Sequence, residues 1–215
     1  MTMKILIGQP KLEASIEQLE AELRSHPEAD IVLYPEGYLN DHVDQACRLA
    51  SAFGTSIITG YKKPKDRAII INRKGEILLD RAKYETGAVT ELDGLGIACL
   101  LCDELVLQGL PADESVRRDL IVHPIGVGMF SQAQFDEWVE TARQIARANR
   151  AMIIGTSHAD GSFRDSEVSL PIAYCIDSSG EDVFISNNDV RSRILNFNTH
   201  DVIIIPNSGE VTVGG

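Results

Sequence analysis

Uninterrupted apolar runs recur along this chain and predict its strands. Such runs show no polar alternation, which is typical of strands buried on both faces of a covered, mostly parallel sheet. Several are bounded by glycine, proline, asparagine or aspartate, the residues that favour turns. The predicted strands occupy residues 4–8, 30–34, 56–60, 68–72, 76–82, 97–101, 119–124, 151–156, 168–176, 182–186 and 201–205.

A second kind of apolar spacing predicts helices between these strands. Leu12, Ile16, Leu19 and Leu23 are 4, 3 and 4 residues apart, which gives one buried stripe on a helix. The segment 43–53 has a similar period, and 104–110 is expected to form a short helix or turn. Ser131 is a suitable N-cap for a long helix that ends near residue 149.

The order of these elements predicts the fold class. Hairpin turns at 73–75 and 177–180 indicate that part of the sheet structure is antiparallel. Hairpins within an α/β alternation favour two sheets packed together with helices outside, a four-layer α-β-β-α sandwich. A chain of 215 residues suits one domain. We expect that domain over residues 1–206 and a polar C-terminal tail over 207–215.

Charge and composition exclude several partners. The net charge of −12 argues against binding to nucleic acid or to an anionic membrane surface. The sequence has neither a run of ~18 apolar residues nor a signal-peptide pattern, so a cytoplasmic location is expected. Four cysteines are too few for a disulfide framework and are expected to be free thiols. The Cys99-Leu-Leu-Cys102 spacing lacks a second ligand pair, so no metal site is predicted.

Three chemically distinct side chains follow apolar runs. Glu36 follows the run 30–35, Lys83 follows 76–82, and Cys102 ends 96–101. Taken singly, a solvated glutamate, a surface lysine and a core cysteine are the more common explanations. Together they supply a base, a cation and a nucleophile, which a reactive thiol requires. We therefore expect them to meet at one sheet edge.

The segments that carry these residues resemble the signature of the nitrilase, or carbon–nitrogen hydrolase, superfamily. In that signature a glutamate follows a strand and a proline, a lysine follows a later strand, and a cysteine closes an apolar strand with an acid two residues on. The corresponding segments here are 29–36, 78–83 and 97–104, and the segments 3–10, 72–76, 118–124 and 146–155 also fit. The resemblance therefore spans nearly the whole chain.

The resemblance implies an α-β-β-α sandwich and a thiol-dependent hydrolase of a small amide, without metal or organic cofactor. Glu36 would act as the base, Cys102 as the nucleophile, and Lys83 with the backbone N–H of Asp103 would hold the oxyanion. It also implies a homo-oligomer, dimer or larger, that pairs through helices beside the site. The segment 131–149 is the candidate face for that pairing.

Other positions extend or depart from this pattern. The superfamily often has a second glutamate between the lysine and the cysteine, for which Glu91 is the first choice and Glu85 the second. His123 follows a strand and is a candidate for lining the substrate site, although a hydrogen-bonded edge histidine explains it better. The Gly126 loop, on the same edge, is a candidate for contacting substrate, with a simple turn as the alternative. The residue directly after Cys102 is Asp103, where the superfamily often has an aromatic residue, and the segment between Lys83 and Cys102 is shorter than in most members. The pocket is therefore expected to be open or completed by a partner subunit.

Two alternatives of other classes remain open. A catalytically silent member of the fold, used for binding or assembly, would keep the fold with its three side chains splayed or its pocket filled. An unrelated flavodoxin-like binding fold would not bring the three side chains together at all. The group Ser157, His158 and Asp160 contains serine-triad residue types, but a polar loop explains it better.

Overall fold

The computed structural model describes residues 2–62, 65–86, 89–110, 113, 115–162 and 168–206. Within these residues the chain forms 13 strands and four helices. The strands are β1 (Lys4–Ile7), β2 (Ile31–Leu33), β3 (Ser56–Tyr61), β4 (Arg67–Ile71), β5 (Ile77–Ala82), β6 (Thr90–Leu92), β7 (Leu95–Cys99), β8 (Leu120–Ile125), β9 (Met152–Ser157), β10 (Ile172–Ile176), β11 (Asp182–Asn187), β12 (Arg193–Asn196) and β13 (Val202–Ile204). The helices are α1 (Glu17–Ser25), α2 (Val43–Phe53), α3 (Glu104–Leu107) and α4 (Gln132–Asn149). The predicted tail, 207–215, lies outside the described residues.

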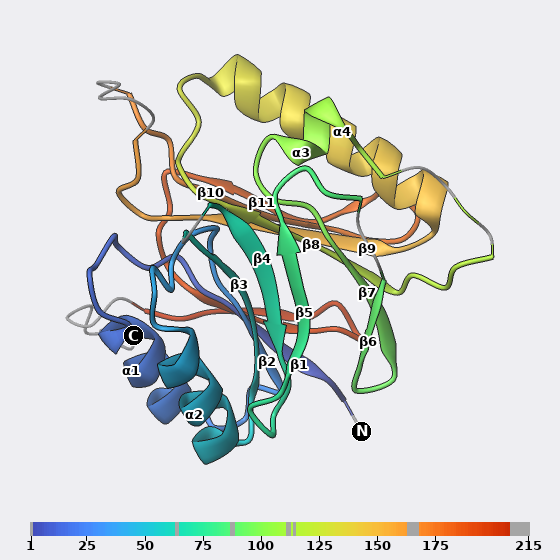
Figure 1. Ribbon diagram of the computed structural model, residues 1–215. Coiled ribbons are helices and arrows are strands. Elements are labelled where there is room, and N and C mark those ends of the chain that lie inside the picture. The colour runs from blue at the N-terminus through green and yellow to red at the C-terminus, as the bar shows by residue number, and fades with distance from the viewer. Residues whose placement is uncertain are drawn as a thin grey trace, which may run out of the picture.

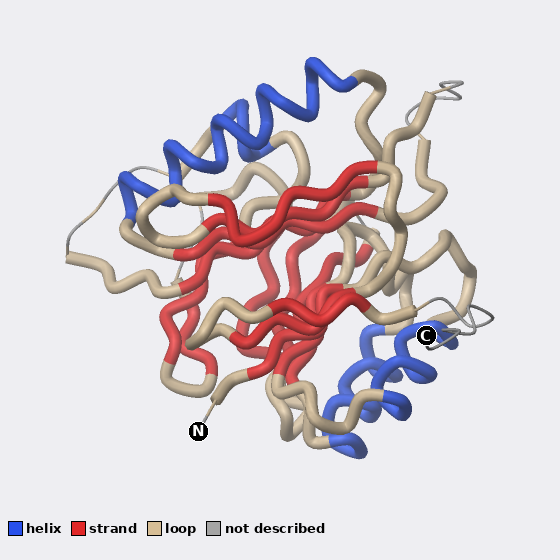
Figure 2. The backbone as a smooth tube through the Cα atoms, turned by 180° about the vertical axis from the view of Figure 1, so that it is seen from behind, coloured by secondary structure: helices blue, strands red, loops and turns tan. Residues whose placement is uncertain are grey.

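The strands form two sheets that pack face to face. One sheet has the order β13-β12-β1-β2-β3-β4-β5, and the other β11-β10-β9-β8-β7-β6. Each has a parallel centre, β1-β2-β3 in the first and β7-β8-β9 in the second, with antiparallel strands on both sides. Helices α1 and α2 cover the outer face of the first sheet, and α3 and α4 cover that of the second (Figure 1). Seen from behind, the two strand layers lie between two helical layers (Figure 2). The predicted α-β-β-α sandwich is confirmed.

Alternating side chains fill three cores, which explains the uninterrupted apolar runs. In β1, Ile5 and Ile7 face the space between the sheets, whereas Leu6 packs beneath α1 and α2. In β7, Ile97 and Cys99 face the space between the sheets, and Ala98 packs beneath α4. Every position in such a strand meets a buried layer, so the polar alternation of a half-exposed strand is absent.

The structure confirms several element boundaries and corrects others. Helix α2 spans the predicted segment, and Ser131 caps α4 by accepting a hydrogen bond from the backbone N–H of Gln134 at 3.1 Å. Helix α1 begins at Glu17 rather than at Leu12. Leu12 is exposed, and its backbone N–H donates to the Asp160 carboxylate at 2.7 Å, which holds this segment as a loop.

The sequence did not predict strands β6 and β12. Each has only three or four residues, too few to show a period. Their positions depend on pairing: β6 pairs with β7, and β12 lies between β1 and β13. No helix within the described part of the chain has the length and apolar character needed to cross a membrane.

Candidate active site

Cys102 lies in a tight turn just beyond β7. Its backbone φ is +45°, in the left-handed region that is uncommon for residues other than glycine. Three hydrogen bonds hold the strained turn: the Cys102 N–H donates to Pro124 at 2.9 Å, and its carbonyl accepts from Leu105 N–H at 3.2 Å and His123 Nε2 at 2.7 Å. A strained backbone conformation that surrounding hydrogen bonds maintain is common at functional sites, where it holds a side chain in a required position.

Glu36 lies in the turn after β2, on the other sheet. The turn is fixed to β3, because the Thr59 hydroxyl donates to the Pro35 carbonyl at 2.7 Å and the Leu39 N–H donates to Gly60 at 3.1 Å. Gly60 permits this close approach, since a Cβ there would lie 2.8 Å from the Gly37 nitrogen and 3.2 Å from the Glu36 Cα. Glu36 is 5% exposed as a residue, so its side chain is held in a nearly dry environment.

Lys83 follows β5 directly and lies between two carboxylates. Its Nζ is 3.0 Å from Glu36 Oε1 and 2.9 Å from Asp103 Oδ1. The Lys83 backbone N–H donates to the Asp66 carbonyl at 2.9 Å, which anchors the residue to the segment before β4. An ammonium has three donors, so two can serve these carboxylates while one is available to a bound molecule.

The three predicted side chains line one cavity of about 370 Å³. They do not meet at one sheet edge, as expected from the sequence, but between the two sheets: β2 and β5 belong to the first sheet, and β7 to the second. The other lining residues are Lys62, Asp66, Asp103, Gly126, Val127, Gly128, Met129, Phe130, Gln134 and Trp138.

Burial sets the protonation of the base and the nucleophile. It raises the pKa of Glu36 to about 7, although the Lys83 ammonium acts in the opposite direction. Burial and the neighbouring Glu36 carboxylate raise the pKa of the Cys102 thiol to about 12, against the opposing effects of Lys83 and the Gly126 N–H. The resting nucleophile is therefore a neutral thiol beside a carboxyl group that can exchange a proton near neutral pH.

Asp103 is held at the edge of the cavity by two partners. Its carboxylate accepts a hydrogen bond from the Tyr84 hydroxyl at 2.7 Å and pairs with Lys83. Burial acts to raise the pKa of Asp103, but these two partners outweigh it and lower that pKa. Asp103 thus remains a carboxylate, and its side chain orients the ammonium of Lys83.

His123 does not line the cavity, so its candidate role in the substrate site is not supported; it is instead the hydrogen-bonded histidine that the sequence favours. It is fully buried on β8, where its Nδ1 is 2.6 Å from the Tyr174 hydroxyl and its Nε2 is 2.7 Å from the Cys102 carbonyl. Burial lowers the pKa of His123 to about 4. The neutral ring therefore supports the Cys102 turn from within the protein. Trp138, which does line the cavity, packs against it at a ring-centroid distance of 5.6 Å.

The structure also places both candidates for a second glutamate outside the cavity. Glu91 is exposed on β6 and pairs with Gly96, near the start of β7, whereas Cys102 lies beyond the other end of that strand. Glu85 is exposed too, and its carboxylate accepts the Ala82 N–H at 3.0 Å. Among the described residues, the second carboxylate on Lys83 comes from Asp103 instead.

Gly126 is in the cavity, as predicted. It follows β8, and a Cβ at this position would lie 3.1 Å from Glu36 Oε2. The glycine therefore lets the base approach the loop closely. The next part of this loop is tied down by paired hydrogen bonds between Met129 and Leu170, at 2.9 and 2.7 Å.

Sequence reasoning missed a buried ion pair behind the site. Arg81 on β5 and Glu104 at the start of α3 have side chains 6% and 0% exposed, and their closest atoms are 2.7 Å apart. An arginine in an apolar strand run gives a weak signal, since it also fits a strand with an exposed face. Trp138 and Gln134 were missed because their spacing on α4 looks like ordinary helix packing.

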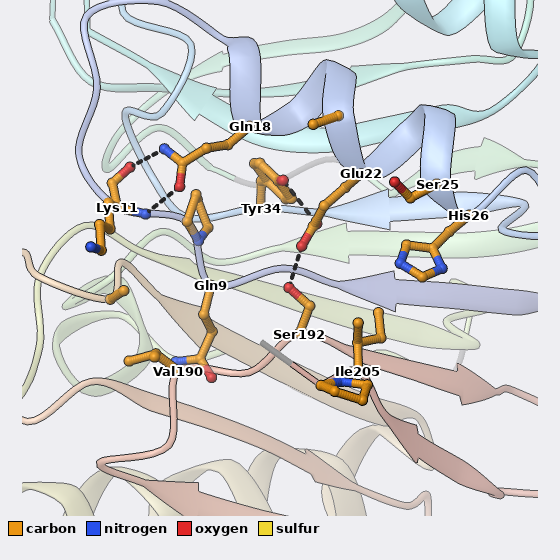
Figure 3. Close-up of a pocket in the computed structure, with 14 residues that line it drawn as sticks. Gln9, Lys11, Gln18, Glu22, Ser25, His26, Tyr34, Val190, Ser192 and Ile205 are labelled. Carbon is orange, nitrogen blue, oxygen red and sulfur yellow. Dashed lines mark hydrogen bonds between the residues drawn. The ribbon is translucent and has the colours of Figure 1, made fainter. Parts of the chain in front are cut away.

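Larger cavities lie elsewhere, and two of them exceed 600 Å³. One, of about 610 Å³, lies beside α1, where the Glu22 carboxylate accepts hydrogen bonds from the hydroxyls of Tyr34 and Ser192 (Figure 3). The other, of about 620 Å³, borders the Arg81–Glu104 pair. Neither is lined by Cys102. Within the described residues no group of three or more histidine, cysteine, aspartate or glutamate side chains is arranged to hold a metal ion.

Comparisons with known proteins agree with this architecture. No family model matches the sequence, and no curated protein matches it. Solved structures do match the fold. An amidase of Nesterenkonia AN1 from the nitrilase superfamily has a TM-score of 0.72 at 12% identity, with 90% of this chain and 91% of that chain covered.

Two further structures give the same result. The carbon–nitrogen hydrolase of Helicobacter pylori G27 has a TM-score of 0.72 at 14% identity, covering 93% of this chain and 90% of that chain. A CN-hydrolase superfamily protein of Xanthomonas campestris has a TM-score of 0.69 at 13% identity, covering 90% and 89%. The chain therefore has the fold of the nitrilase, or carbon–nitrogen hydrolase, superfamily, and the resemblance noted in its sequence is confirmed at the level of the fold.

Proposed function

We propose that this protein is a thiol-dependent hydrolase that cleaves a non-peptide C–N bond in a small amide. The observation that carries the proposal is the arrangement around Lys83. Its ammonium touches the Glu36 carboxyl at 3.0 Å in a cavity that Cys102 also lines. A base, a cation and a nucleophile thus share one space of about 370 Å³, a size that suits a small molecule.

The first half of the reaction forms a thioester. The Glu36 carboxylate removes the proton from the Cys102 thiol as the sulfur attacks the amide carbon. The developing oxyanion accepts hydrogen bonds from the free donor of Lys83 and from the Asp103 backbone N–H. When the tetrahedral intermediate collapses, the C–N bond breaks and the leaving nitrogen takes the proton from Glu36. A pKa of about 7 suits Glu36 to both transfers.

The second half releases the acid. Water enters the place of the departed amine, and Glu36 accepts one of its protons as the oxygen attacks the thioester carbon. The same two donors hold the second oxyanion. The C–S bond then breaks, and the proton on Glu36 returns to the Cys102 sulfur, which restores the resting thiol.

Similar structures support this choice of chemistry. For the Nesterenkonia amidase, solved structures include acrylamide added at the active-site cysteine and the acetamide moiety of fluoroacetamide bound there covalently. The alternative of a catalytically silent module predicts splayed side chains or a filled pocket. Here Lys83 bridges two carboxylates beside an open cavity, so the hydrolase is the better supported function.

Two further expectations belong to the same proposal. All four cysteines are free thiols, which supports a reducing compartment such as the cytoplasm. Self-association through the outer face of α4 follows from the resemblance and would show as a mass above 23.6 kDa in light scattering. A monomer at assay concentrations would remove self-association from the proposal.

The proposal is tested by ammonia release from a panel of small linear amides. We expect turnover by the wild-type protein, its loss in Cys102→Ser, and an acyl adduct on Cys102 detectable by mass spectrometry. Cys47→Ser is the matched control, because Cys47 is a partly exposed free thiol on α2, away from the cavity. Turnover that survives in Cys102→Ser would rule out the thioester mechanism.

A further inference from the structure

The Arg81–Glu104 pair links the two parts of the chain that carry Lys83 and Cys102. It is bidentate: Arg81 Nη1 donates to Glu104 Oε1 at 2.8 Å, and Nη2 donates to Oε2 at 2.7 Å. Both side chains are at least nine-tenths buried, at 6% and 0% exposure. Desolvating two charges is costly, and a buried ion pair is often no more stabilising than apolar residues of similar volume. Its presence here therefore calls for a reason other than stability.

The Glu104 carboxylate binds the immediate neighbours of both reactive residues. Oε1 accepts the backbone N–H of Tyr84, the residue after Lys83, at 2.5 Å. Oε2 accepts the backbone N–H of Leu101, the residue before Cys102, at 2.6 Å. One carboxylate thus joins the lysine turn on the first sheet to the cysteine turn on the second.

Arg81 completes the connection from the other side. Its Nη1 donates to the carbonyls of Ala82 and Glu85, at 3.0 and 2.9 Å, and so encloses the turn that contains Lys83. Its Nη2 donates to the carbonyl of Cys99 at 3.1 Å, at the end of the strand that leads to Cys102. The pair therefore holds backbone on both sides of the lysine and on the strand before the cysteine.

No backbone ladder could do this in its place. Among the described strands, β5 pairs only with β4, and β7 pairs with β6 and β8, so the two strands that deliver these residues lie in different sheets. Their relative position rests on side chains: the Lys83–Asp103 ion pair at the edge of the cavity and, behind it, the buried Arg81–Glu104 pair. A displacement of about 1 Å is enough to slow such chemistry by roughly 10²-fold.

We propose that Arg81 and Glu104 are a positioning pair that sets Lys83 against Cys102, without touching the substrate themselves. The inference rests on the proposed roles of those two residues. It assigns to a buried ion pair, which does not itself line the cavity, the task of keeping the oxyanion donor at the nucleophile. The pair is thus a determinant of rate rather than of fold.

The test compares three changes at the pair with a matched control. Glu104→Gln keeps the shape of the side chain and removes its charge. Arg81→Lys keeps the charge but removes the bidentate guanidinium. Arg81→Met/Glu104→Leu replaces the pair by apolar side chains. Arg193→Lys is the control, because Arg193 on β12 is also a buried arginine in an ion pair. Its side chain is 3% exposed and lies 2.9 Å from Asp189, and it does not line the cavity. Thermal midpoints, amide turnover and iodoacetamide alkylation of Cys102 are measured, with Cys47 as the internal reference thiol.

We expect all three pair variants to lower kcat by at least about tenfold with little change in KM. Alkylation of Cys102 should slow and move to higher pH, as it should in Lys83→Met. The control is expected to lose thermal stability as the pair variants do, but to keep wild-type kcat and wild-type alkylation of Cys102. Thermal midpoints identify the variants that stay folded, and slow chemistry in those variants cannot be ascribed to unfolding.

Two results separate the inference from the proposed function. If the pair variants lose stability like the control but keep the wild-type alkylation profile, the positioning role is wrong, whatever their turnover. If the wild-type protein hydrolyses no amide while Glu104→Gln still shifts Cys102 alkylation, the pair positions the thiol and only the proposed reaction fails.

Discussion

The imidazole of His123 supports the backbone of Cys102 from below, with Nε2 2.7 Å from the Cys102 carbonyl. A carbonyl can only accept, so Nε2 carries the proton and Nδ1 accepts from the Tyr174 hydroxyl at 2.6 Å. A protonated ring could not accept from Tyr174. The hydrogen bond from Tyr174, which holds the ring beneath this turn, therefore depends on a histidine that stays neutral.

This dependence predicts a loss of stability in mild acid. The ordinary histidine pKa of 6.5 falls to about 4 for His123 in the folded protein. Between these values the unfolded chain binds the proton more readily, so the free energy of unfolding decreases as the pH falls from about 6.5 to 4, by up to about 3 kcal/mol. Urea unfolding at several pH values should show that the free energy of unfolding changes less with pH in His123→Gln than in the wild type. His200→Gln, at an exposed site, should keep the wild-type pH dependence; equal pH dependence in all three proteins would contradict the assignment.

Glu36→Gln should abolish turnover, because glutamine cannot accept the thiol proton. General acid–base catalysis is commonly worth about 10²–10⁴-fold, and we expect a loss in kcat/KM of that order. In the wild type, kcat/KM should rise with pH and level off above about 7, where Glu36 is ionised. Glu91→Gln is the control, since Glu91 is exposed on β6. A wild-type profile without this acid limb would count against Glu36 as the base.

The same substitution should stabilise the fold at alkaline pH. The pKa of Glu36 is raised from 4.5 to about 7, so its contribution to stability is fully present below pH 4.5 and is lost as the pH rises through 7. At pH 8 the buried charge costs up to about 3 kcal/mol relative to its protonated form. Thermal midpoints at pH 5 and pH 8 should differ less in Glu36→Gln than in the wild type. A larger difference in the variant would contradict the burial of an ionised Glu36.

Asp103→Asn should make Cys102 easier to ionise. The Asp103 carboxylate raises the pKa of the neighbouring thiol and also competes with Glu36 for the Lys83 ammonium. Its removal should shift iodoacetamide alkylation of Cys102 to lower pH, while turnover falls because Lys83 loses an anchor. Asp66→Asn is the matched control, because Asp66 lines the same cavity. An unchanged pH profile of Cys102 alkylation in Asp103→Asn would contradict this role of the Lys83–Asp103 ion pair.

Gly126→Ala should impair the base without unfolding the protein. The new Cβ would lie 3.1 Å from Glu36 Oε2, which is tighter than ordinary van der Waals contact. We expect kcat to fall by about tenfold as the carboxyl is displaced, with the circular dichroism spectrum preserved. Val127→Ala, at the next position in the cavity lining, should change KM more than kcat. Wild-type kcat in Gly126→Ala would mean that Glu36 has room to move.

Much of the fold was predictable because long elements carry their own signals. The apolar period of α2, the Ser131 cap of α4 and the uninterrupted strands all reflect local burial. Strand β12 shows the limit. It begins with a buried arginine and has four residues, and its pairing with β1 joins positions about 190 residues apart in the chain. Only tertiary packing decides such a strand.

The site divides in the same way. The order of Glu36, Lys83 and Cys102 was visible because each follows an apolar run. The place of Glu91 was not, since sequence distance does not tell which end of β7 its strand reaches. The sequence left two interpretations of His123 open, and burial with two hydrogen bonds makes it a support beneath the nucleophile.

Strand β12 also determines when the site can exist during synthesis. It pairs with β1, which pairs with β2, the strand that leads to Glu36. Arg193 at its start is translated 91 residues after Cys102 (193 minus 102). A nascent chain therefore holds every reactive side chain long before its first sheet is complete. We expect the Cys102 thiol to gain its partners only after β12 has been translated and has paired with β1. The moment at which the site becomes reactive is therefore set by a strand that contributes no reactive side chain.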